Sequence, residues 1–463
     1  MSTTKSSNTS PSVSAKQTQQ ILDSLALRVD GKRLWDALMT LAEIGATPKG
    51  GNCRLALTEE DRAGRELVTG WLEAAGLTLR VDEIGNIFAR RPGRNDSLPP
   101  VATGSHIDTQ PTGGKFDGCY GVLAGLEVMR VLDERGIETE APLEVVIWTN
   151  EEGSRFVPVM MGSGVHAGLI TLEKALSAID RDGDSVAASL ARTGYAGDIP
   201  VGSHDFGAYF EAHIEQGPVL EQEEITIGAV TGSLGLHWFD VVVSGQEAHA
   251  GPTPMPYRRD ALKTACALVS DILTLADAYQ PNGRVTCGEF NVHPNSRNVI
   301  PGQVRFSVDL RHLEPAVLAE MHDQLKALCL KHHAANQSDK QRVDIELIEV
   351  QHIPPTPFAP ELIEMVRSAS RELALSFRDM ETGAGHDAVQ IAGINPVAMI
   401  FVPCEDGISH NESENAEPSD LEDGANVLLL AMLKRAGIVS SASVADSANA
   451  ASASKDITAE NAQ

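Results

Sequence analysis

The stretch TGSHIDTQPTGGKFDG, residues 103–118, carries a histidine, two aspartates and four glycines directly after a short apolar run. A surface loop needs no such set of side chains. A metal site does, because divalent cations take carboxylate and imidazole ligands on a backbone that can bend closely around the ion. His106 and Asp117 are therefore candidate metal ligands.

Three further candidate ligands lie far along the chain. Glu152 stands in NEEG, His213 in EAHIEQGP and His410 in SHNESE. Three imidazoles and two carboxylates suit two zinc or manganese ions with one carboxylate bridging them. Asp117 is the natural bridge, because it stands on the first turn of a predicted helix with glycines on both sides. Two ions bridged in this way lower the pKa of a shared water to near neutrality.

Glu151 directly precedes Glu152, beyond the end of an apolar strand. Adjacent side chains past a strand end point in different directions, so one carboxylate can bind metal while the other takes the proton of the attacking water. We interpret Glu151 as that catalytic base. Taken singly, an interior histidine or a solvated Glu-Glu pair has an ordinary structural explanation. The conjunction of HID, GGKFDG and NEEG, each at or just beyond a strand end, is specific.

The elements that must position these residues alternate between helix and strand. Helices are predicted over 58–76 and 117–136, a hairpin over 77–90, and buried strands over 100–108 and 143–150. Buried strands separated by helices predict an α/β sheet covered on both faces. Sites in such sheets lie beyond the carboxyl ends of the strands, where His106 and the Glu151–Glu152 pair fall.

A second pattern begins near Gly228. Residues 255–279 read as one amphipathic helix, and 303–313 alternate as a half-exposed strand. The order strand-helix-strand-strand-helix-strand is ferredoxin-like. The α/β pattern returns near Pro360. We therefore predict an α+β domain over 229–348, inserted into a discontinuous catalytic domain over 21–228 and 349–439.

Length and composition bound the class of protein. A chain of 463 residues exceeds one comfortable core, which predicts two domains. The net charge of -27 argues against a nucleic-acid partner or an anionic membrane surface, and no apolar stretch is long enough to predict a membrane span. Six scattered cysteines without a CxxC pair fit reduced thiols in a cytoplasmic protein. Residues 1–20 and 440–463 read as disordered tails, with a transit peptide as the weaker alternative for the first.

The motifs GSHIDTQPTGGKFDGCYGVLAGLEV, TNEEGSRF, EAHIEQGPVLE, AHAGPTPMPYRRDAL and SHNESE resemble the amidase branch of the dinuclear-metal aminoacylase/carboxypeptidase superfamily. That branch contains N-carbamoyl-L-amino-acid hydrolases, allantoate amidohydrolases and fungal-type β-ureidopropionases. The resemblance implies a metallopeptidase-like catalytic domain whose mixed sheet has helices on both faces. It also implies two divalent ions (Zn²⁺, or Mn²⁺ or Co²⁺) on the five ligands, with Glu151 as base. Asp108 would hold the ring of His106.

The inserted domain is, by the same resemblance, a lid that builds a homodimer. His249 lies in a Gly/Pro-rich loop, where it can contact a developing oxyanion, and the resemblance places it in the partner subunit's site. Arg311 ends a strand on its polar face, and a guanidinium suits a two-point grip on a substrate carboxylate. Asn298 and Gln216 match the branch's amide-bearing substrate contacts. Without the resemblance, His249 is an ordinary loop histidine and Arg311 a solvated edge arginine. The role of His386, in GAGHDA, stays open.

The expected reaction is hydrolysis of the ureido C–N bond of an N-carbamoyl amino acid, of the L-α or β-alanine type, to ammonia, carbon dioxide and the amino acid. The sequence DTQPTGGKFDG favours an N-carbamoyl amino acid over allantoate as the substrate, so an allantoate amidohydrolase is the alternative. A dipeptidase comes third. A binding protein that kept this fold would lack a ligand or Glu151, and neither is missing.

Overall fold

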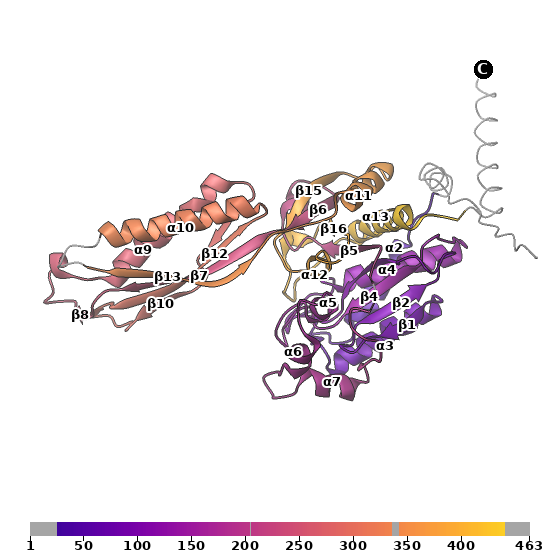
Figure 1. The fold of residues 1–463 in the computed structure, drawn as a ribbon, viewed down its shortest axis with the longest axis horizontal. Coiled ribbons are helices and arrows are strands. Elements are labelled where there is room, and N and C mark those ends of the chain that lie inside the picture. Colours follow the sequence, from indigo (N-terminus) through magenta and orange to yellow (C-terminus); the bar gives the residue numbers. More distant parts are fainter. Residues whose placement is uncertain (1–25, 204, 336–341, 440–463) are drawn as a thin grey trace, which may run out of the picture. The chain divides into compact units, whose positions relative to one another are not determined.

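The computed structural model describes residues 26–203, 205–335 and 342–439 (Figure 1). The tails predicted over 1–20 and 440–463 lie outside these residues. The chain divides into two compact units. Of the described residues, the larger holds those up to Thr231, Phe358–Met380 and those from Gly385 on, and the smaller holds those within Gly232–Pro357 and Glu381–Ala384. The predicted insertion spans 229–348, a shorter segment than the smaller unit.

The larger unit is built on a mixed sheet in the order β1-β2-β4-β3-β5-β16-β6. Its strands are β1 (Thr78–Val81), β2 (Ile87–Arg91), β3 (Val101–His106), β4 (Leu143–Trp148), β5 (Ala208–Ile214), β6 (Ile227–Ser233) and β16 (Val397–Val402), and β15 (Phe377–Thr382) pairs with β6. Strands β4, β3, β5 and β16 pair in parallel, and the predicted hairpin β1–β2 is antiparallel. Every residue of these four parallel strands is buried, which explains why they are rich in apolar residues.

Helices cover both faces of this sheet, as predicted. The helices are α2 (Gly31–Ala42), α3 (Glu59–Ala74), α4 (Cys119–Glu134), α5 (Met161–His166), α6 (Leu172–Ser177), α7 (Val186–Thr193), α8 (Val219–Gln222), α11 (Pro360–Glu372), α12 (Asp387–Ile391) and α13 (Pro418–Ala436). Gly125 of α4 lies against Val145 of β4, whereas the ring of His166 in α5 packs edge-to-face against the ring of Trp148. Val145 and Trp148 are three residues apart in one strand, so they point to opposite faces.

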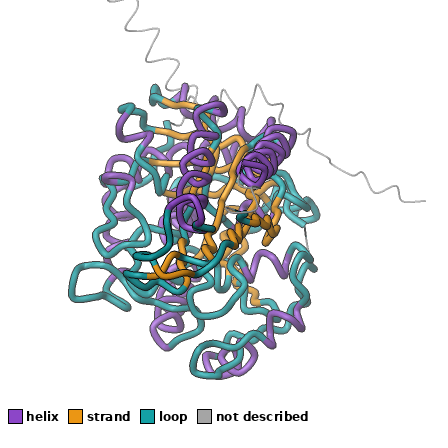
Figure 2. The backbone as a smooth tube through the Cα atoms, turned by 90° about the vertical axis from the view of Figure 1, so that its left-hand side faces the viewer, coloured by secondary structure: helices purple, strands orange, loops and turns teal. Residues whose placement is uncertain are grey.

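The smaller unit is an antiparallel sheet in the order β10-β12-β7-β13, with β9 also paired to β12 (Figure 2 colours its strands orange). Its strands are β7 (Gly235–Ser244), β9 (Arg284–Thr286), β10 (Phe290–His293), β12 (Gln303–His312) and β13 (Asp344–Ile353), and a separate pair joins β8 (Ala248–His249) to β11 (Val299–Ile300). Helices α9 (Ala261–Leu273) and α10 (Pro315–Ala335) pack on this sheet. Alternate residues of β7, among them Phe239 and Val241, form its core.

The single helix predicted over 255–279 is wrong. The structure has a 3₁₀ turn over Met255–Tyr257, then α9, and a second 3₁₀ segment over Thr274–Tyr279. The side chain of Asp260 accepts a hydrogen bond from the backbone N–H of Lys263, and this cap begins α9 at Ala261. Amphipathic spacing alone did not reveal where the cap interrupts the helix.

Two further features concern the setting of the chain. The six cysteines are all free thiols in the structure. Within the described residues, 26–203, 205–335 and 342–439, no helix is both long enough and apolar enough to cross a bilayer. A cytoplasmic location stays a prediction.

Candidate metal centre

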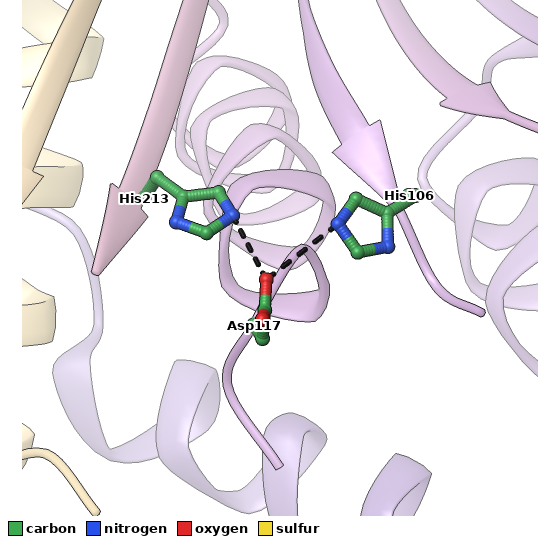
Figure 3. A group of neighbouring side chains, drawn as sticks. All are labelled: His106, Asp117 and His213. Atoms are coloured by element: carbon green, nitrogen blue, oxygen red, sulfur yellow. Dashed lines mark ion pairs between the residues drawn. The ribbon is translucent and has the colours of Figure 1, made fainter. Parts of the chain in front are cut away.

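The five candidate ligands converge at the carboxyl ends of the parallel strands. His106 is the last residue of β3, His213 is the penultimate residue of β5, and Glu152 follows the end of β4. His410 lies in the loop that follows β16, and Asp117 comes just before α4. Since neighbouring parallel strands end at one edge of the sheet, residues far apart in sequence meet there. Figure 3 shows His106 and His213 on either side of Asp117.

Asp117 faces two different ligand sets with its two carboxylate oxygens. Its Oδ1 lies 3.6 Å from His106 Nε2 and 3.1 Å from His213 Nε2. Its Oδ2 lies 3.2 Å from His410 Nε2, which is also 3.3 Å from Glu152 Oε2. The centre therefore consists of two triads, His106–Asp117–His213 and Asp117–Glu152–His410, and in each the ligand atoms lie within 4.8 Å of one another. This is the arrangement expected of a bridging carboxylate.

The orientation of two histidines fits metal ligation. Nδ1 of His106 lies 2.8 Å from the carbonyl oxygen of Asp108, and Nδ1 of His213 lies 2.9 Å from that of Ile214. A carbonyl oxygen can only accept, so each Nδ1 carries the proton of this hydrogen bond and each Nε2 is directed at Asp117. Metal-ligating histidines are held in this way by their other ring nitrogen. With two carboxylates and a third imidazole, the residues present fit two divalent transition-metal ions.

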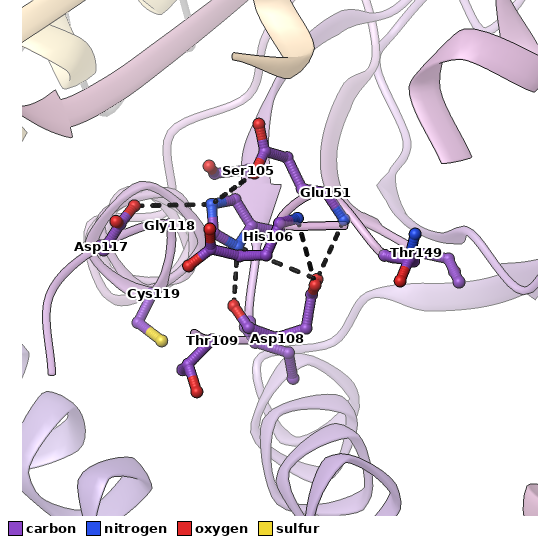
Figure 4. A network of polar contacts seen from close by, with 12 residues as sticks. Ser105, His106, Asp108, Thr109, Asp117, Gly118, Cys119, Thr149 and Glu151 are labelled. Atoms are coloured by element: carbon purple, nitrogen blue, oxygen red, sulfur yellow. Dashed lines mark hydrogen bonds and ion pairs between the residues drawn. The ribbon is translucent and has the colours of Figure 1, made fainter. Parts of the chain in front are cut away.

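Asp108 supports the site in a different way from the one predicted. Its main-chain oxygen, not its carboxylate, accepts from the His106 ring, and the carboxylate oxygen lies 3.9 Å from that nitrogen. The carboxylate instead accepts the backbone N–H of Glu151 at 3.2 Å (Figure 4). It also accepts the backbone N–H of Glu152 at 3.3 Å. Asp108 thus ties the end of β3 to the turn that carries Glu151 and Glu152.

Glu151 is buried beside the first triad, with Oε2 3.6 Å from His106 Nε2. Its neighbour Glu152 turns toward His410, so the two adjacent carboxylates diverge. Burial raises the pKa of Glu151 well above its usual 4.5; His106 opposes this shift, and the nearby Asp387 reinforces it. A carboxyl group with a raised pKa can take a proton from water and give it up again, as a general acid–base catalyst must.

The charged groups of the site shift one another's pKa values. Burial opposes the charged form of Asp117, but hydrogen bonds from His106, His213 and His410 outweigh it and hold the pKa of Asp117 well below 3.8. The Asp117 hydrogen bond is the largest influence on His410 and raises its pKa to about 9. The low pKa of Asp117 and the raised pKa of His410 reflect this mutual attraction, and a metal ion on His410 would compete with its proton.

Glu414 is a supporting residue that the sequence reasoning missed. Its buried carboxylate accepts the backbone N–H groups of Phe116 at 2.8 Å and Asp117 at 3.1 Å, and also the hydroxyl of Ser409. A Cβ on Gly114 would lie 2.0 Å from this carboxylate, which explains the glycine there. The available signal was the position of Glu414 four residues after His410 in SHNESE.

Gly118 is the second glycine of the motif with a structural requirement. It has a positive φ of 66°, and a Cβ there would lie 2.4 Å from the His106 ring. Any side chain at this position would therefore displace a ligand. The glycines of GGKFDG are thus explained by the crowding around Asp117 and His106.

Two further predicted or open residues adjoin the centre. Gln216 donates from Nε2 to Asp117 Oδ2 at 2.9 Å, so in this structure the predicted substrate contact is directed at Asp117. His386 is buried with its ring centroid 4.6 Å from that of His213. Burial lowers the pKa of His386 well below 6.5, which leaves a neutral ring at the edge of the first triad.

The remaining predicted residues belong to the smaller unit. His249 is exposed on β8, Asn298 is exposed just before β11, and Arg311 lies on β12. Arg311 donates from Nε and Nη2 to the Asp309 carboxylate and from Nη1 to the carbonyl oxygen of Gly383, all within that unit. Their action on a substrate held at the metal centre stays a prediction.

Comparison with known proteins finds relatives along most of the chain. The chain matches Peptidase family M20/M25/M40 over residues 102–434, a segment that contains all five ligands and Glu151. It is 44% identical to the N-carbamoyl-L-amino-acid amidohydrolase of Rhizobium meliloti over 412 residues, which cover 89% of this chain and 98% of that one. It is 34% identical to the allantoate amidohydrolase of Bacillus subtilis, covering 85% of this chain and 95% of that one.

The fold also matches a solved structure along almost its whole length. An amidase of the hydantoinase/carbamoylase family from Burkholderia multivorans superimposes with a TM-score of 0.86 at 54% sequence identity. The match covers 89% of this chain and 99% of that chain. This chain therefore shares its fold with a protein of that family over most of its length.

Proposed function

The chain belongs to peptidase family M20/M25/M40, and from that premise we propose that it hydrolyses the ureido C–N bond of N-carbamoyl amino acids. The observation that carries this proposal is the pair of ligand triads that share Asp117, with the buried base Glu151 beside them. The name of the relative at 44% identity supports the carbamoyl substrate and its L-α form. Allantoate is the second candidate substrate, because the allantoate amidohydrolase of Bacillus subtilis matches nearly as much of the chain.

Two divalent ions, when bound, would polarise the ureido carbonyl and acidify a water molecule. Glu151 accepts the proton of the attacking water as its oxygen bonds to the carbonyl carbon. Glu151 then delivers that proton to the leaving nitrogen as the C–N bond breaks and ammonia departs. The remaining carbamate loses carbon dioxide to yield the free amino acid. The carboxylate of Asp108 accepts the backbone N–H of Glu151 and so holds the turn that carries this residue. The base therefore keeps its place beside the reacting atoms.

Residues of the smaller unit supply recognition in this proposal. Arg311 uses three of its five N–H groups on Asp309 and Gly383, which holds the guanidinium still and leaves two for a substrate carboxylate. Asn298, together with Gln216 of the larger unit, is proposed to contact the substrate's polar atoms, and His249 the oxygen that becomes negative. Recognition of a free carboxylate by Arg311 favours an amino-acid product with an unblocked acid group.

A substrate panel tests the proposed function. We expect the metal-loaded protein to release ammonia from N-carbamoyl-L-methionine or N-carbamoyl-β-alanine faster than from allantoate. The carboxamide of N-carbamoyl-L-methionine is the matched control, and it should be a poorer substrate because a neutral amide cannot pair with Arg311. Fastest turnover of allantoate would establish the second candidate instead. Turnover of dipeptides alone, or of no compound in the fully loaded protein, would overturn the proposal.

We also propose a homodimer built through the smaller unit, in which His249 serves the metal centre of the partner subunit. Mixing two inactive variants, Glu151→Gln and His249→Ala, tests this. Under conditions that exchange subunits, a mixed dimer has one site with both defects and one site with neither. With random pairing about half the dimers are mixed, so about a quarter of wild-type activity should return.

The comparison that decides this test is between action in trans and action in cis. If His249 served its own subunit's centre, each chain would carry its own defect and no activity would return. Subunit exchange is confirmed independently with tagged chains. The matched control mixes Glu151→Gln with Asp117→Ala, two defects of one centre, which should give no recovery. No recovery in the first mixture, with exchange demonstrated, would exclude the trans arrangement.

A further inference from the structure

A second cluster of metal-ligand side chains lies wholly within the smaller unit. His237 of β7, His322 of α10 and Glu349 of β13 each place one ligand atom within 4.8 Å of those of the other two. The three residues come from three different elements, and the proposed hydrolysis uses none of them. Two imidazoles and a carboxylate are ligands that zinc and similar divalent ions accept.

His237 lies at the centre of this cluster. The residue is only 5% exposed, and its Nε2 lies 3.0 Å from Glu349 Oε2. This contact pairs the imidazole of His237 directly with the Glu349 carboxylate, so two potential ligand atoms face each other. Two ligands of one tetrahedral zinc ion lie about 3.4 Å apart, close to the distance found here.

The other two imidazoles complete the surroundings. The rings of His237 and His322 meet edge to face with centroids 4.5 Å apart, and the ring of His352 stacks on His237 at 4.3 Å. Burial lowers the pKa of both His237 and His322, which favours the neutral ring that binds metal. Glu349 supplies the negative charge, and its exposed side chain leaves the cluster open to solvent.

An irregularity in β13 brings Glu349 onto the same side as the histidines. The pairing of β13 with β7 shifts register between Glu349 and Gln351, so Glu349 lies opposite Phe239 while His352 lies opposite His237. Residues three apart in a regular strand point to opposite faces. The bulge cancels that alternation, and both side chains face the same side as His237 and Phe239. Bulges re-aim side chains in this manner at sheet edges and functional sites.

We propose that His237, His322 and Glu349 bind a third divalent ion of the zinc type, separate from the two of the metal centre. The ion would be held by three protein ligands with a remaining position open to water. It would link α10 and β13 to β7. This assignment rests on the geometry of the smaller unit and stands whether or not the substrate proposal is correct.

Elemental analysis of the full-length protein tests this site. The chain is stripped with a chelator, reloaded with excess Zn²⁺, desalted and assayed for zinc per chain. We expect three zinc ions in the wild type and two in His322→Ala. The matched control is His333→Ala on the same helix, outside the cluster, which should hold three. Glu349→Gln provides a second variant that keeps the shape of the exposed side chain, and it should also lose the third ion.

Cobalt gives a readout that does not depend on activity. In the Asp117→Ala background, Co²⁺ should still produce a visible absorption band from the smaller unit, and adding His322→Ala should remove that band. Equal zinc contents for the wild type, His322→Ala and Glu349→Gln would overturn the proposal. So would an equal loss in His333→Ala, because it would mean that surface histidines bind zinc without a built site. Circular dichroism confirms that each variant is folded.

Discussion

Glu151→Gln is expected to lower kcat by about 10²–10⁴-fold, the range that a positioned general base contributes. Glutamine keeps the size and polarity of the side chain but cannot accept the proton of the attacking water. Glu151 lies beside His106 but outside both ligand triads, so the metal content should stay at the wild-type value. Steady-state ammonia release, together with elemental analysis of the same preparation, measures both quantities.

The neighbouring glutamate is the matched control for this experiment. Glu152 faces His410 in the second triad, so Glu152→Gln should weaken binding of one ion, and added metal should restore part of the activity. Excess metal should not restore Glu151→Gln. If Glu151→Gln lost an ion and recovered on metal addition, Glu151 would be a ligand and the base would have to be sought elsewhere.

Asp117→Ala is expected to remove both ions of the metal centre and with them all measurable turnover. Each oxygen of Asp117 faces a different triad, so one truncation takes a ligand from both. The variant also leaves His106, His213 and His410 without the carboxylate that they share. Elemental analysis after desalting should show two ions fewer than in the wild type, whatever the number bound elsewhere on the chain.

A variant of one triad gives the comparison for Asp117→Ala. Glu152→Ala should lose one ion while His106, Asp117 and His213 keep the other. A loss of one ion in both variants would show that Asp117 does not bridge. Wild-type metal content in Asp117→Ala would contradict the dinuclear centre as a whole. Urea unfolding of both variants in chelator separates these outcomes from a general loss of stability.

Much of the larger unit and its centre could be predicted from local sequence. Thr58 caps α3 by accepting from the backbone N–H of Asp61, and the short segments of β3 and β4 form the predicted buried strands, which pair in parallel. Since strand ends gather sites in such sheets, the positions of His106 and Glu151 were informative before any contact was known. The prediction of one helix over 255–279 was wrong because amphipathic periodicity does not show that a capping residue, Asp260, begins a new helix at Ala261.

The sequence by itself determined which residue types stand at the strand ends, because helix and strand formation depend on neighbours along the chain. Only the tertiary structure decided which oxygen of Asp117 faces which histidine, and that Asp108 holds His106 through its main chain. Glu414 and the cluster around His237 likewise depend on contacts between distant segments, and on a bulge that breaks the period of two. Such contacts follow from how packed elements are placed in space, which no local pattern encodes.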